Sequence, residues 1–334
     1  MKDMYILAIE SSCDETSCAI VKNGEEDIST ITMSQIDIHT LYGGVVPEIA
    51  SREHVKCITL VIEECLKKAN FDMSMIDAIA VTYGPGLVGS LLVGVEAAKT
   101  LALVYNKPLI KVNHMAGHIY ANNLTKKMVY PLIALVISGG HTDLIYMKDE
   151  YSFEKIGGTL DDAVGECYDK VARVIGVGYP GGPTIDLMAS KGKHEYNLPL
   201  PLMDDSYNFS FSGLKSAVIN LSHNFEQRGE KLNKENLATS FQDVVIDIIS
   251  KKTMKALHDY NTKRLVVAGG VSANKGIRNK LTELCEKENI DISVPDFKYC
   301  TDNATMIGAA AYFAYKHGEI ADDELNAVPN LNLF

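Results

Sequence analysis

Two histidines four residues apart give this sequence its clearest chemical signal. His114 and His118 lie in the segment VNHMAGHIYANN, which we expect to be helical. Residues i and i+4 of a helix share one face about one turn apart, so the two imidazoles could bind one metal ion. Two ordinary surface histidines would show the same spacing. The pair therefore predicts a metal site only together with a third ligand, which spacing alone does not identify.

The residue after the first histidine excludes one class of enzyme. The zinc-protease motif H-E-x-x-H requires a glutamate there as the general base. Met115 occupies that position, so a metalloprotease mechanism does not follow. Asp302, in CTDNATMIGAAA, could supply a carboxylate ligand, although it could equally be the cap of the small-residue helix that follows. Two histidines and one carboxylate would favour iron(II), with zinc or another divalent ion as the alternative.

An acidic turn near the start of the chain is a second candidate. The segment ESSCDET (10–16) places Glu10, Asp14 and Glu15 around an expected hairpin turn. Such a carboxylate cluster can hold a hydrated metal ion or act as a general base. A solvated acidic turn without any function would have the same sequence, so the cluster carries weight only in combination with other signals.

Four glycine-rich segments form a third signal, because glycine lets the backbone approach an anion closely. They are TYGPGLVGSLLVG (82–94), SGGHT (138–142), GYPGGPTID (178–186) and AGGVSANK (268–275). None is a G-x-G-x-x-G or Walker motif. Each alone could be a simple connection, such as a type I′ hairpin turn at Gly139–Gly140. Together they suggest that the protein binds the phosphate and ribose of a nucleotide.

The elements that must position these residues alternate between strands and helices in both halves. Hairpins are expected at MYILAIESS with CAIVKNG and around SGGHT, and strands precede the other glycine loops. Helical spacing covers 54–69, Asp186 is expected near the first turn of a helix, and Ser272 or Asn274 could cap another. This pattern predicts an α/β protein with two related domains, 1–127 and 128–302. Loops and helices are expected over about 181–236, and helix 303–317 is expected to pack back on the first domain.

Composition sets limits on compartment and partners. The net charge of −11 argues against a large nucleic-acid surface on this chain alone. Seven cysteines without a C-x-x-C pair argue for a reducing compartment. Glu96 and Lys99 interrupt the longest apolar stretch, so no membrane span is expected. We therefore expect a cytoplasmic protein without a membrane partner.

Ten motifs together resemble the TsaD family of tRNA threonylcarbamoyladenosine synthases, long labelled O-sialoglycoprotein endopeptidases. They are AIESSCDETS, GGVVPEIASREH, TYGPGLVGSLLVG, NHMAGHIYAN, SGGHTDL, DDAVGECYDKVAR, YPGGP, FSFSGLK, GGVSANK and CTDNATMIG. The resemblance runs from Ile6 to about Ala314. It implies a two-domain actin/Hsp70/sugar-kinase (ASKHA) fold with duplicated ribonuclease-H-like domains.

The resemblance also implies an activity. Members of this family transfer threonylcarbamoyl from threonylcarbamoyl-AMP to the exocyclic amine of the adenosine 3′ of the anticodon, in tRNAs that read codons beginning with A. The implied metal ligands are His114, His118 and Asp302, holding one divalent ion, Fe²⁺ by preference, with Zn²⁺ or Mg²⁺ as alternatives. The implied substrate-binding residues are Ile137, Ser138, Gly139, Gly140, His141, Asp169, Gly182, Asp186 and Asn274.

The resemblance further implies partners. These are tRNA, a TsaB-like paralogue, a TsaE-like ATPase and, upstream, a TsaC-type enzyme that forms the adenylate. Asp14 or Glu15 is our candidate for a catalytic base or tRNA-facing carboxylate. Two other functions stay open: an ATP-binding kinase or ATPase of the same fold, and a non-catalytic scaffold of a tRNA-modifying complex.

Overall fold

The computed structural model describes residues 3–202 and 204–333, which form two compact units. Unit 1 comprises residues 3–128, 149–152 and 295–333, and unit 2 comprises the described residues of 129–148 and 153–294. Each unit contains one sheet with helices packed against it. This architecture confirms the predicted mixed α/β class.

The described residues of unit 1 form a six-stranded sheet in the order β11-β5-β4-β1-β2-β3. The strands are β1 (Tyr5–Glu10), β2 (Glu15–Lys22), β3 (Glu26–Ser34), β4 (Ala78–Gly84), β5 (Leu109–Asn113) and β11 (Ile320–Ala321). Strands β1, β2 and β3 form an antiparallel meander, whereas β1, β4 and β5 are parallel. The parallel arrangement brings the carboxyl ends of β1, β4 and β5 to one edge, where Glu10 and Asn113 lie.

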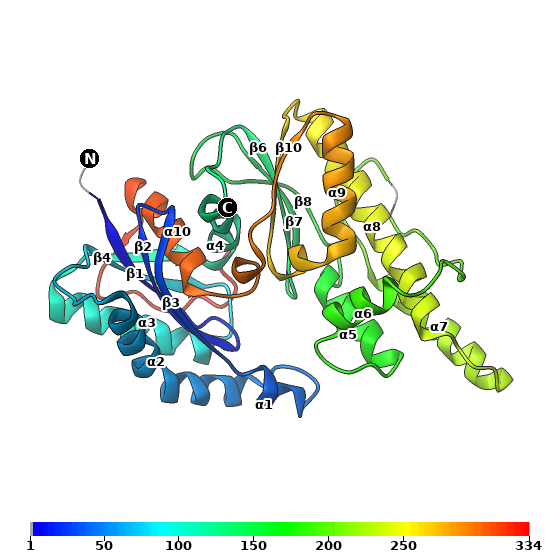
Figure 1. Ribbon diagram of the computed structural model, residues 1–334, viewed down its shortest axis with the longest axis horizontal. Coiled ribbons are helices and arrows are strands. Elements are labelled where there is room, and N and C mark those ends of the chain that lie inside the picture. Colours follow the sequence, from blue (N-terminus) through cyan, green and yellow to red (C-terminus); the bar gives the residue numbers. More distant parts are fainter. Residues whose placement is uncertain (1–2, 203, 334) are drawn as a thin grey trace. The chain divides into compact units, whose positions relative to one another are not determined.

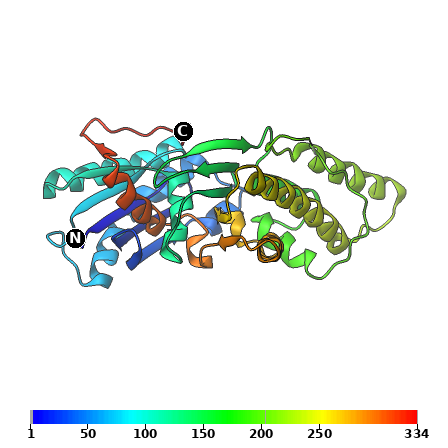
Figure 2. The same cartoon turned by 90° about the horizontal axis from the view of Figure 1, so that it is seen from above.

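Strand residues point alternately to opposite sides of this sheet, and helices cover the central strands on both sides. Leu7 and Ile9 belong to the core formed with α2 (Pro47–Ala69) and α3 (Val88–Tyr105). Ala8 faces α10 (Ala304–Lys316), which also packs on α4 (His114–Tyr120). The orange-red helix α10 crosses the blue strands β1 and β2 in both views (Figures 1 and 2). The short helices α1 (Ile36–Thr40), η1 (Ala121–Leu124) and η3 (Phe297–Tyr299) complete the unit.

Helix α3 is the one helix in the described part of the chain that is long and apolar enough to cross a membrane by length and composition. Its residues Val95 and Ala98 are fully buried in the unit 1 core, and the helix packs on α2 and β4. This packing accounts for the buried third of the apolar segment.

The described residues of unit 2 form a five-stranded sheet in the order β10-β9-β6-β7-β8. The strands are β6 (Leu132–Ile137), β7 (Thr142–Met147), β8 (Glu154–Gly158), β9 (Arg264–Ala268) and β10 (Asp291–Ser293). The helices are α5 (Val164–Val174), α6 (Gly181–Ala189), α7 (Ser212–Arg228), α8 (Lys234–Asp259), η2 (Gly270–Ala273) and α9 (Lys275–Lys287). As in unit 1, an antiparallel meander (β6, β7, β8) continues into parallel strands (β6, β9, β10).

The structure corrects several local expectations. The helix expected from His54 begins at Pro47, because the proline fits the first helical turn. The edge strand β3 was not predicted, since its half-exposed sequence EDISTITMS lacks a continuous apolar run. Asp186 lies in the second turn of α6 rather than near its start, because the helix already begins at Gly181.

Candidate metal centre and glycine-turn site

The two histidines lie on the short helix α4, which begins directly after strand β5. The Asn113 side chain accepts a hydrogen bond from the Met115 N–H at 2.8 Å and so caps the helix. All residues of α4 are buried, and the rings of His114 and His118 are 4.6 Å apart at an interplanar angle of 80°. The expected helical pair is therefore present, but inside the unit rather than on its surface.

Asp302 reaches this pair from the segment that precedes α10. Its Oδ1 lies 3.5 Å from Nε2 of His114 and 3.2 Å from Nε2 of His118. The cap of α10 is Asn303, whose side chain accepts from the Met306 N–H. The alternative role of Asp302 as a helix cap is thereby excluded, and its carboxylate is directed at the histidines.

These three side chains could hold a metal ion. One ligand atom from each lies within 4.8 Å of the others. Separations of 3.2 and 3.5 Å suit donors that share a cation at about 2.1 Å from each. Both histidines are buried, whereas the Asp302 side chain is partly exposed, so the group has the composition and the access that a divalent cation needs.

The electrostatics of the group also favour a positive charge. Burial alone would lower the pKa of His114, but the carboxylates of Asp302 and Glu10 outweigh it and raise that pKa to about 9. At neutral pH a proton therefore occupies the ring that could otherwise bind a cation. A metal ion must displace this proton to bind the ring, so protonation of His114 and metal binding compete with each other.

The acidic turn lies beside this group. The Asp14 carbonyl accepts from the Gln35 N–H, and the Glu15 carboxyl accepts from the Ser34 hydroxyl at 3.0 Å. Burial, together with the charges of Asp302 and Asp14, raises the pKa of Glu15 to about 9. Burial also raises the pKa of the neighbouring Cys13 thiol, which excludes a thiolate there. The turn thus adds one carboxyl group that is protonated at neutral pH while no cation is bound.

The first glycine-rich segment packs against this turn. A Cβ on Gly86 would lie 2.6 Å from the Ser12 carbonyl oxygen, and a Cβ on Gly94 would collide with the Ser11 hydroxyl. The Leu87 N–H donates to the same Ser12 carbonyl. These glycines therefore serve close packing, which lets the β1–β2 turn rest on the start of α3.

The second glycine-rich segment, in unit 2, joins β6 to β7. Neither Gly139 nor Gly140 has a positive φ, so the turn is not of type I′. Both are exposed, and an added Cβ would meet no atom within 4 Å. By contrast, Gly165 fits tightly below the turn, since a Cβ there would lie 2.6 Å from the Ser138 carbonyl oxygen. The glycines at the tip leave open space in front of the backbone.

The remaining candidates from unit 2 hold the starts of two helices. The Asp169 carboxylate accepts from the N–H groups of Gly181 and Gly182 at the start of α6. Asn274 caps α9, and its amide also donates to Tyr168 and Gln242.

Asp186 connects these two positions. It accepts from the Gln242 side chain and from the N–H groups of Lys275 and Gly276. Gln242 therefore links Asp186 of α6 to Asn274 at the start of α9, whereas Asp169 of α5 bonds separately to the start of α6. Burial raises the pKa of Asp169, against the effect of its backbone hydrogen bonds.

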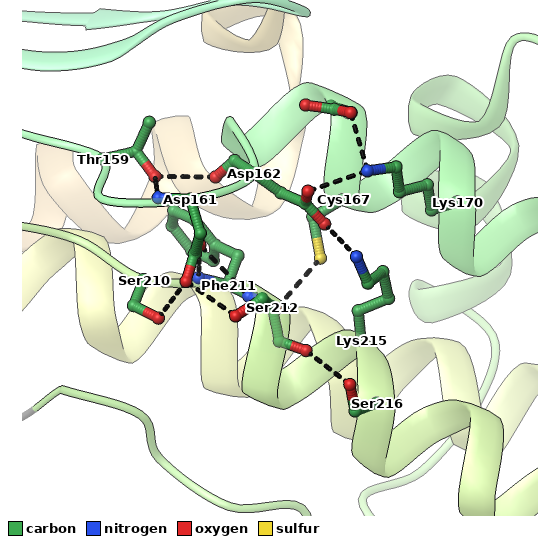
Figure 3. Close-up of polar contacts among 11 residues, drawn as sticks. Thr159, Asp161, Asp162, Cys167, Lys170, Ser210, Phe211, Ser212, Lys215 and Ser216 are labelled. Atoms are coloured by element: carbon green, nitrogen blue, oxygen red, sulfur yellow. Dashed lines mark hydrogen bonds and ion pairs between the residues drawn. The ribbon is translucent and has the colours of Figure 1, made fainter.

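A further polar network anchors α5, the helix that carries Asp169. Figure 3 shows Lys170 and Lys215 each paired with Asp162, at 2.7 and 2.6 Å. Asp161 accepts from the backbone and hydroxyl groups of Ser212 and so holds the start of α7. The first turn of α5 is in turn bonded to the glycine turn, where the Thr142 hydroxyl accepts from the Val164 N–H.

The sequence patterns did not identify three residues that lie around the candidate metal centre. Glu10 was noted only as part of the acidic turn, and Thr82 and Ser12 were not assigned any role. All three are buried around His114. A signal did exist, because Glu10 ends a fully apolar strand, where an acidic residue requires a specific partner.

Comparisons with known proteins assign the chain first to a class and then to a family. The solved structure of component A of the Acidaminococcus fermentans (R)-2-hydroxyglutaryl-CoA dehydratase is similar in fold, with a TM-score of 0.55, 15% identity and coverage of 94% of this chain and 98% of that chain. HypF of T. kodakarensis has a TM-score of 0.61 at 14% identity, covering 97% of this chain and 49% of that one. Both are ASKHA-type proteins, so the chain has the predicted two-domain ASKHA fold.

The sequence matches identify the family. The family model TsaD, described as tRNA N6-adenosine threonylcarbamoyltransferase, matches residues 27–309. A protein of that name from Staphylococcus saprophyticus subsp. saprophyticus is 56% identical over 329 residues, which cover 98% of this chain and 96% of that protein. The chain therefore belongs to the TsaD family of transferases.

Proposed function

We propose that this chain forms threonylcarbamoyladenosine in tRNA. It transfers the threonylcarbamoyl group from threonylcarbamoyl-AMP to the exocyclic amine of the adenosine 3′ of the anticodon, in tRNAs that read codons beginning with A. The observation that carries the proposal is the convergence of His114, His118 and Asp302 in a chain whose family is a tRNA N6-adenosine threonylcarbamoyltransferase.

The chemistry defines what the protein must supply. The substrate is a mixed anhydride with AMP as the leaving group, and the adenine amine is a poor nucleophile because its lone pair is delocalised. Positioning and charge stabilisation must therefore provide most of the rate enhancement. A divalent cation held by the two histidines and Asp302, Fe²⁺ by its donor set with Zn²⁺ or Mg²⁺ as alternatives, would polarise an acyl or phosphate oxygen of the substrate.

Residues of unit 2 would hold the adenylate. The segment Ile137–His141 includes two exposed glycines with open space in front of them, where backbone N–H groups could steady the phosphate. Asp169, Asp186 and Asn274 fix the starts of α6 and α9, and a Cβ on Gly182 would meet no atom within 4 Å, so there is open space beside the start of α6. This geometry supports the role that the family resemblance gives these residues.

A carboxylate of the acidic turn would accept the proton that leaves the adenine amine. Glu15 is protonated at neutral pH, partly because the negative charge of Asp302 lies near it. A cation held by Asp302 would offset that charge and favour ionised Glu15. Asp14, which is partly exposed in the same turn, is the alternative base.

The acidic character of the chain supports a function within a complex. A net charge of −11 is unfavourable for binding a polyanion, so partner subunits would supply part of the basic surface for tRNA. We propose a TsaB-like paralogue and a TsaE-like ATPase as these partners, with a TsaC-type enzyme providing the adenylate and all steps taking place in the cytoplasm.

Reconstitution tests the proposal. The purified chain would be incubated with the partner subunits, the TsaC-type enzyme, threonine, bicarbonate, ATP and unmodified tRNA, and the nucleosides analysed by mass spectrometry. We expect threonylcarbamoyladenosine from the parent chain and from the double variant His194→Ala/His258→Ala. Both substituted histidines are exposed residues in surface ion pairs, so this variant is a matched control.

The double variant His114→Ala/His118→Ala should lose at least about 100-fold in rate, because it removes the cation that stabilises charge in the transition state. Undiminished product from this variant would overturn the metal-assisted mechanism and favour a scaffold. Nucleotide hydrolysis without any modified nucleoside would favour the kinase or ATPase alternative.

A further inference from the structure

Glu10 is a buried carboxylate with one histidine of the metal centre as its neighbour. It is the last residue of β1, and none of its surface is exposed. Its Oε1 accepts from the Ser12 N–H at 2.5 Å, and its Oε2 accepts from the Thr82 hydroxyl at 2.6 Å. The same Oε2 lies 3.2 Å from Nδ1 of His114. A carboxylate is not buried in this way without partners, because desolvation of its charge is costly.

The contact with His114 determines which ring nitrogen carries hydrogen. Both carboxylate oxygens act as acceptors, so Nδ1 of His114 must donate. Ser12 Oγ, 3.1 Å from the same nitrogen, can also accept this hydrogen. The lone pair of the neutral ring is then on Nε2, the nitrogen 3.5 Å from Asp302. Histidine ligands commonly have such an outer carboxylate, which orients the ring and makes it a better donor.

The other histidine has no equivalent partner. Nδ1 of His118 is buried, and no hydrogen-bond partner for it exists in the described part of the chain. This side chain is held by packing, including the edge contact with the His114 ring, and by Asp302 at its Nε2, 3.2 Å away. The pair is therefore asymmetric, because Nδ1 of His114 donates to the Glu10 carboxylate and Nδ1 of His118 has no such acceptor among the described residues.

Thr82 and the strand pairing hold Glu10 in place. Strands β1 and β4 are parallel, with Ile9 beside Val81, so Glu10 and Thr82 are the next residues at the carboxyl edge. Thr82 is fully buried, and its hydroxyl donates to Oε2 of Glu10 at the edge of the sheet, which fixes this oxygen in place. The pairing of β1 with β4 therefore fixes the position of Glu10, and Glu10 in turn orients the ring of His114.

We infer that Glu10 is a positioning residue of the metal centre, which holds His114 with Nε2 free for the cation, and that Thr82 fixes Glu10 in that orientation. The inference rests on the proposed function only in taking His114 and His118 as ligands. Glu10 itself contacts neither substrate nor cation. Its effect should therefore appear in metal affinity and in the state of the His114 ring, even where no turnover is measured.

Metal titration tests this inference. Chelator-treated protein would be titrated with Co²⁺, followed by its visible absorption, and with Zn²⁺ in competition with a chromophoric chelator. We expect Glu10→Gln to bind either ion about 10- to 100-fold more weakly than the parent, as is typical when the outer partner of a ligand is changed. Thr82→Val should weaken binding by a smaller factor, and Thr82→Ser, which keeps the hydroxyl, should restore it.

Nitrogen-15 NMR of the histidine side chains gives a second readout. The zinc-loaded parent should show His114 with hydrogen on Nδ1, and Glu10→Gln should show altered nitrogen shifts for this ring alone. If Glu10→Gln does not fold, as judged by circular dichroism, Thr82→Val and its Thr82→Ser rescue still test the role of Glu10. Thr82→Val removes the hydrogen bond to Oε2 of Glu10 but keeps the carboxylate itself.

The outcomes separate this inference from the proposed function. Metal affinity that is unchanged in His114→Ala/His118→Ala would overturn the metal centre and this inference together. Loss of binding in that double variant, with parent-like affinity and parent-like ring shifts in Glu10→Gln and Thr82→Val, would overturn the role of Glu10 alone. Weakened binding in the Glu10 and Thr82 variants, with rescue by serine, would support it.

Discussion

At the scale of single residues, the candidate centre depends on which groups are charged. Against the effect of burial, the carboxylates of Asp302 and Glu10 raise the pKa of His114 to about 9, and burial together with the charges of Asp302 and Asp14 raises the pKa of Glu15 to about 9. Such perturbed groups gathered in one place are typical of functional sites. The pattern differs from an ordinary surface ion pair because one divalent cation could be held by His114, His118 and Asp302 together.

A histidine outside the centre shows the opposite behaviour. His54 on α2 is buried, with Nδ1 accepting from the Thr16 hydroxyl at 2.7 Å and Nε2 donating to the Cys13 carbonyl at 2.9 Å. Burial lowers its pKa below 6.5, against the effects of the Cys13 bond and nearby carboxylates. Neutral His54 thus holds the acidic turn to α2, and a proton on Nδ1 would require the Thr16 hydroxyl to accept instead of donate.

We predict that this histidine contributes to acid destabilisation. Because its folded pKa lies below its unfolded value of 6.5, the unfolded chain binds the proton more tightly. The stability present above pH 6.5 is therefore lost as the pH falls through the folded pKa. His54→Gln should make the free energy of unfolding less dependent on pH between about 7.5 and about 5.5, as measured by urea denaturation. An unchanged pH dependence would contradict the assignment of a neutral, buried imidazole.

At the scale of elements, helix starts organise unit 2. Asp161, Asp169, Asp186 and Asn274 each hold the first residues of a helix, and Asp161 does so for α7 through four acceptor contacts. Unpaired N–H groups at a helix start require such acceptors. These side chains anchor the helix starts in addition to the apolar core of unit 2, which includes Ile137 and residues of α5, α6 and α9.

We predict that Asp161→Ala destabilises the protein by about 1–2 kcal/mol, the usual cost of removing a helix cap. Asp247→Ala is the matched control, since this exposed aspartate makes one surface ion pair with Lys251 and should cost at most about 0.5 kcal/mol. Urea denaturation of both variants measures the difference. Equal effects of the two substitutions would show that the network in Figure 3 does not anchor α7.

Elements also explain how much the sequence could predict. The spacing of His114 and His118 predicted their proximity, because a helix brings residues i and i+4 together regardless of the fold. The residues alone left Asp302 as either a third ligand or a helix cap, and only the family resemblance chose between the two, since the approach of Asp302 depends on how α10 packs on the sheet. Thr82 and Glu10 meet through the parallel register of β1 and β4, which local periodicity does not specify. Strand β3 was missed because an edge strand has no continuous apolar pattern.

At the scale of the whole molecule, charge limits how the chain meets its substrate. A net charge of −11 repels a polyanion, although the family acts on tRNA. Much of the local positive charge is also neutralised within the fold. The buried Lys252, for example, donates to the carboxylate of Asp204 and to two carbonyl oxygens.

We predict that the chain alone binds unmodified tRNA weakly, and that adding the proposed TsaB-like and TsaE-like subunits tightens binding at least about tenfold at physiological salt. Filter binding at several salt concentrations measures both the affinity and the number of phosphate contacts. Tight binding by the isolated chain, with no gain from the partners, would show that its own surface suffices.

The central claim is that His114, His118 and Asp302 together bind one divalent cation. Its most direct test is an anomalous difference map from crystals of the protein purified without chelators, recorded at the absorption edges of iron and zinc. We expect a single peak about 2.0–2.2 Å from Nε2 of both histidines and from an Asp302 carboxylate oxygen. A map with no peak at these three side chains, or with the only peak elsewhere, would contradict it.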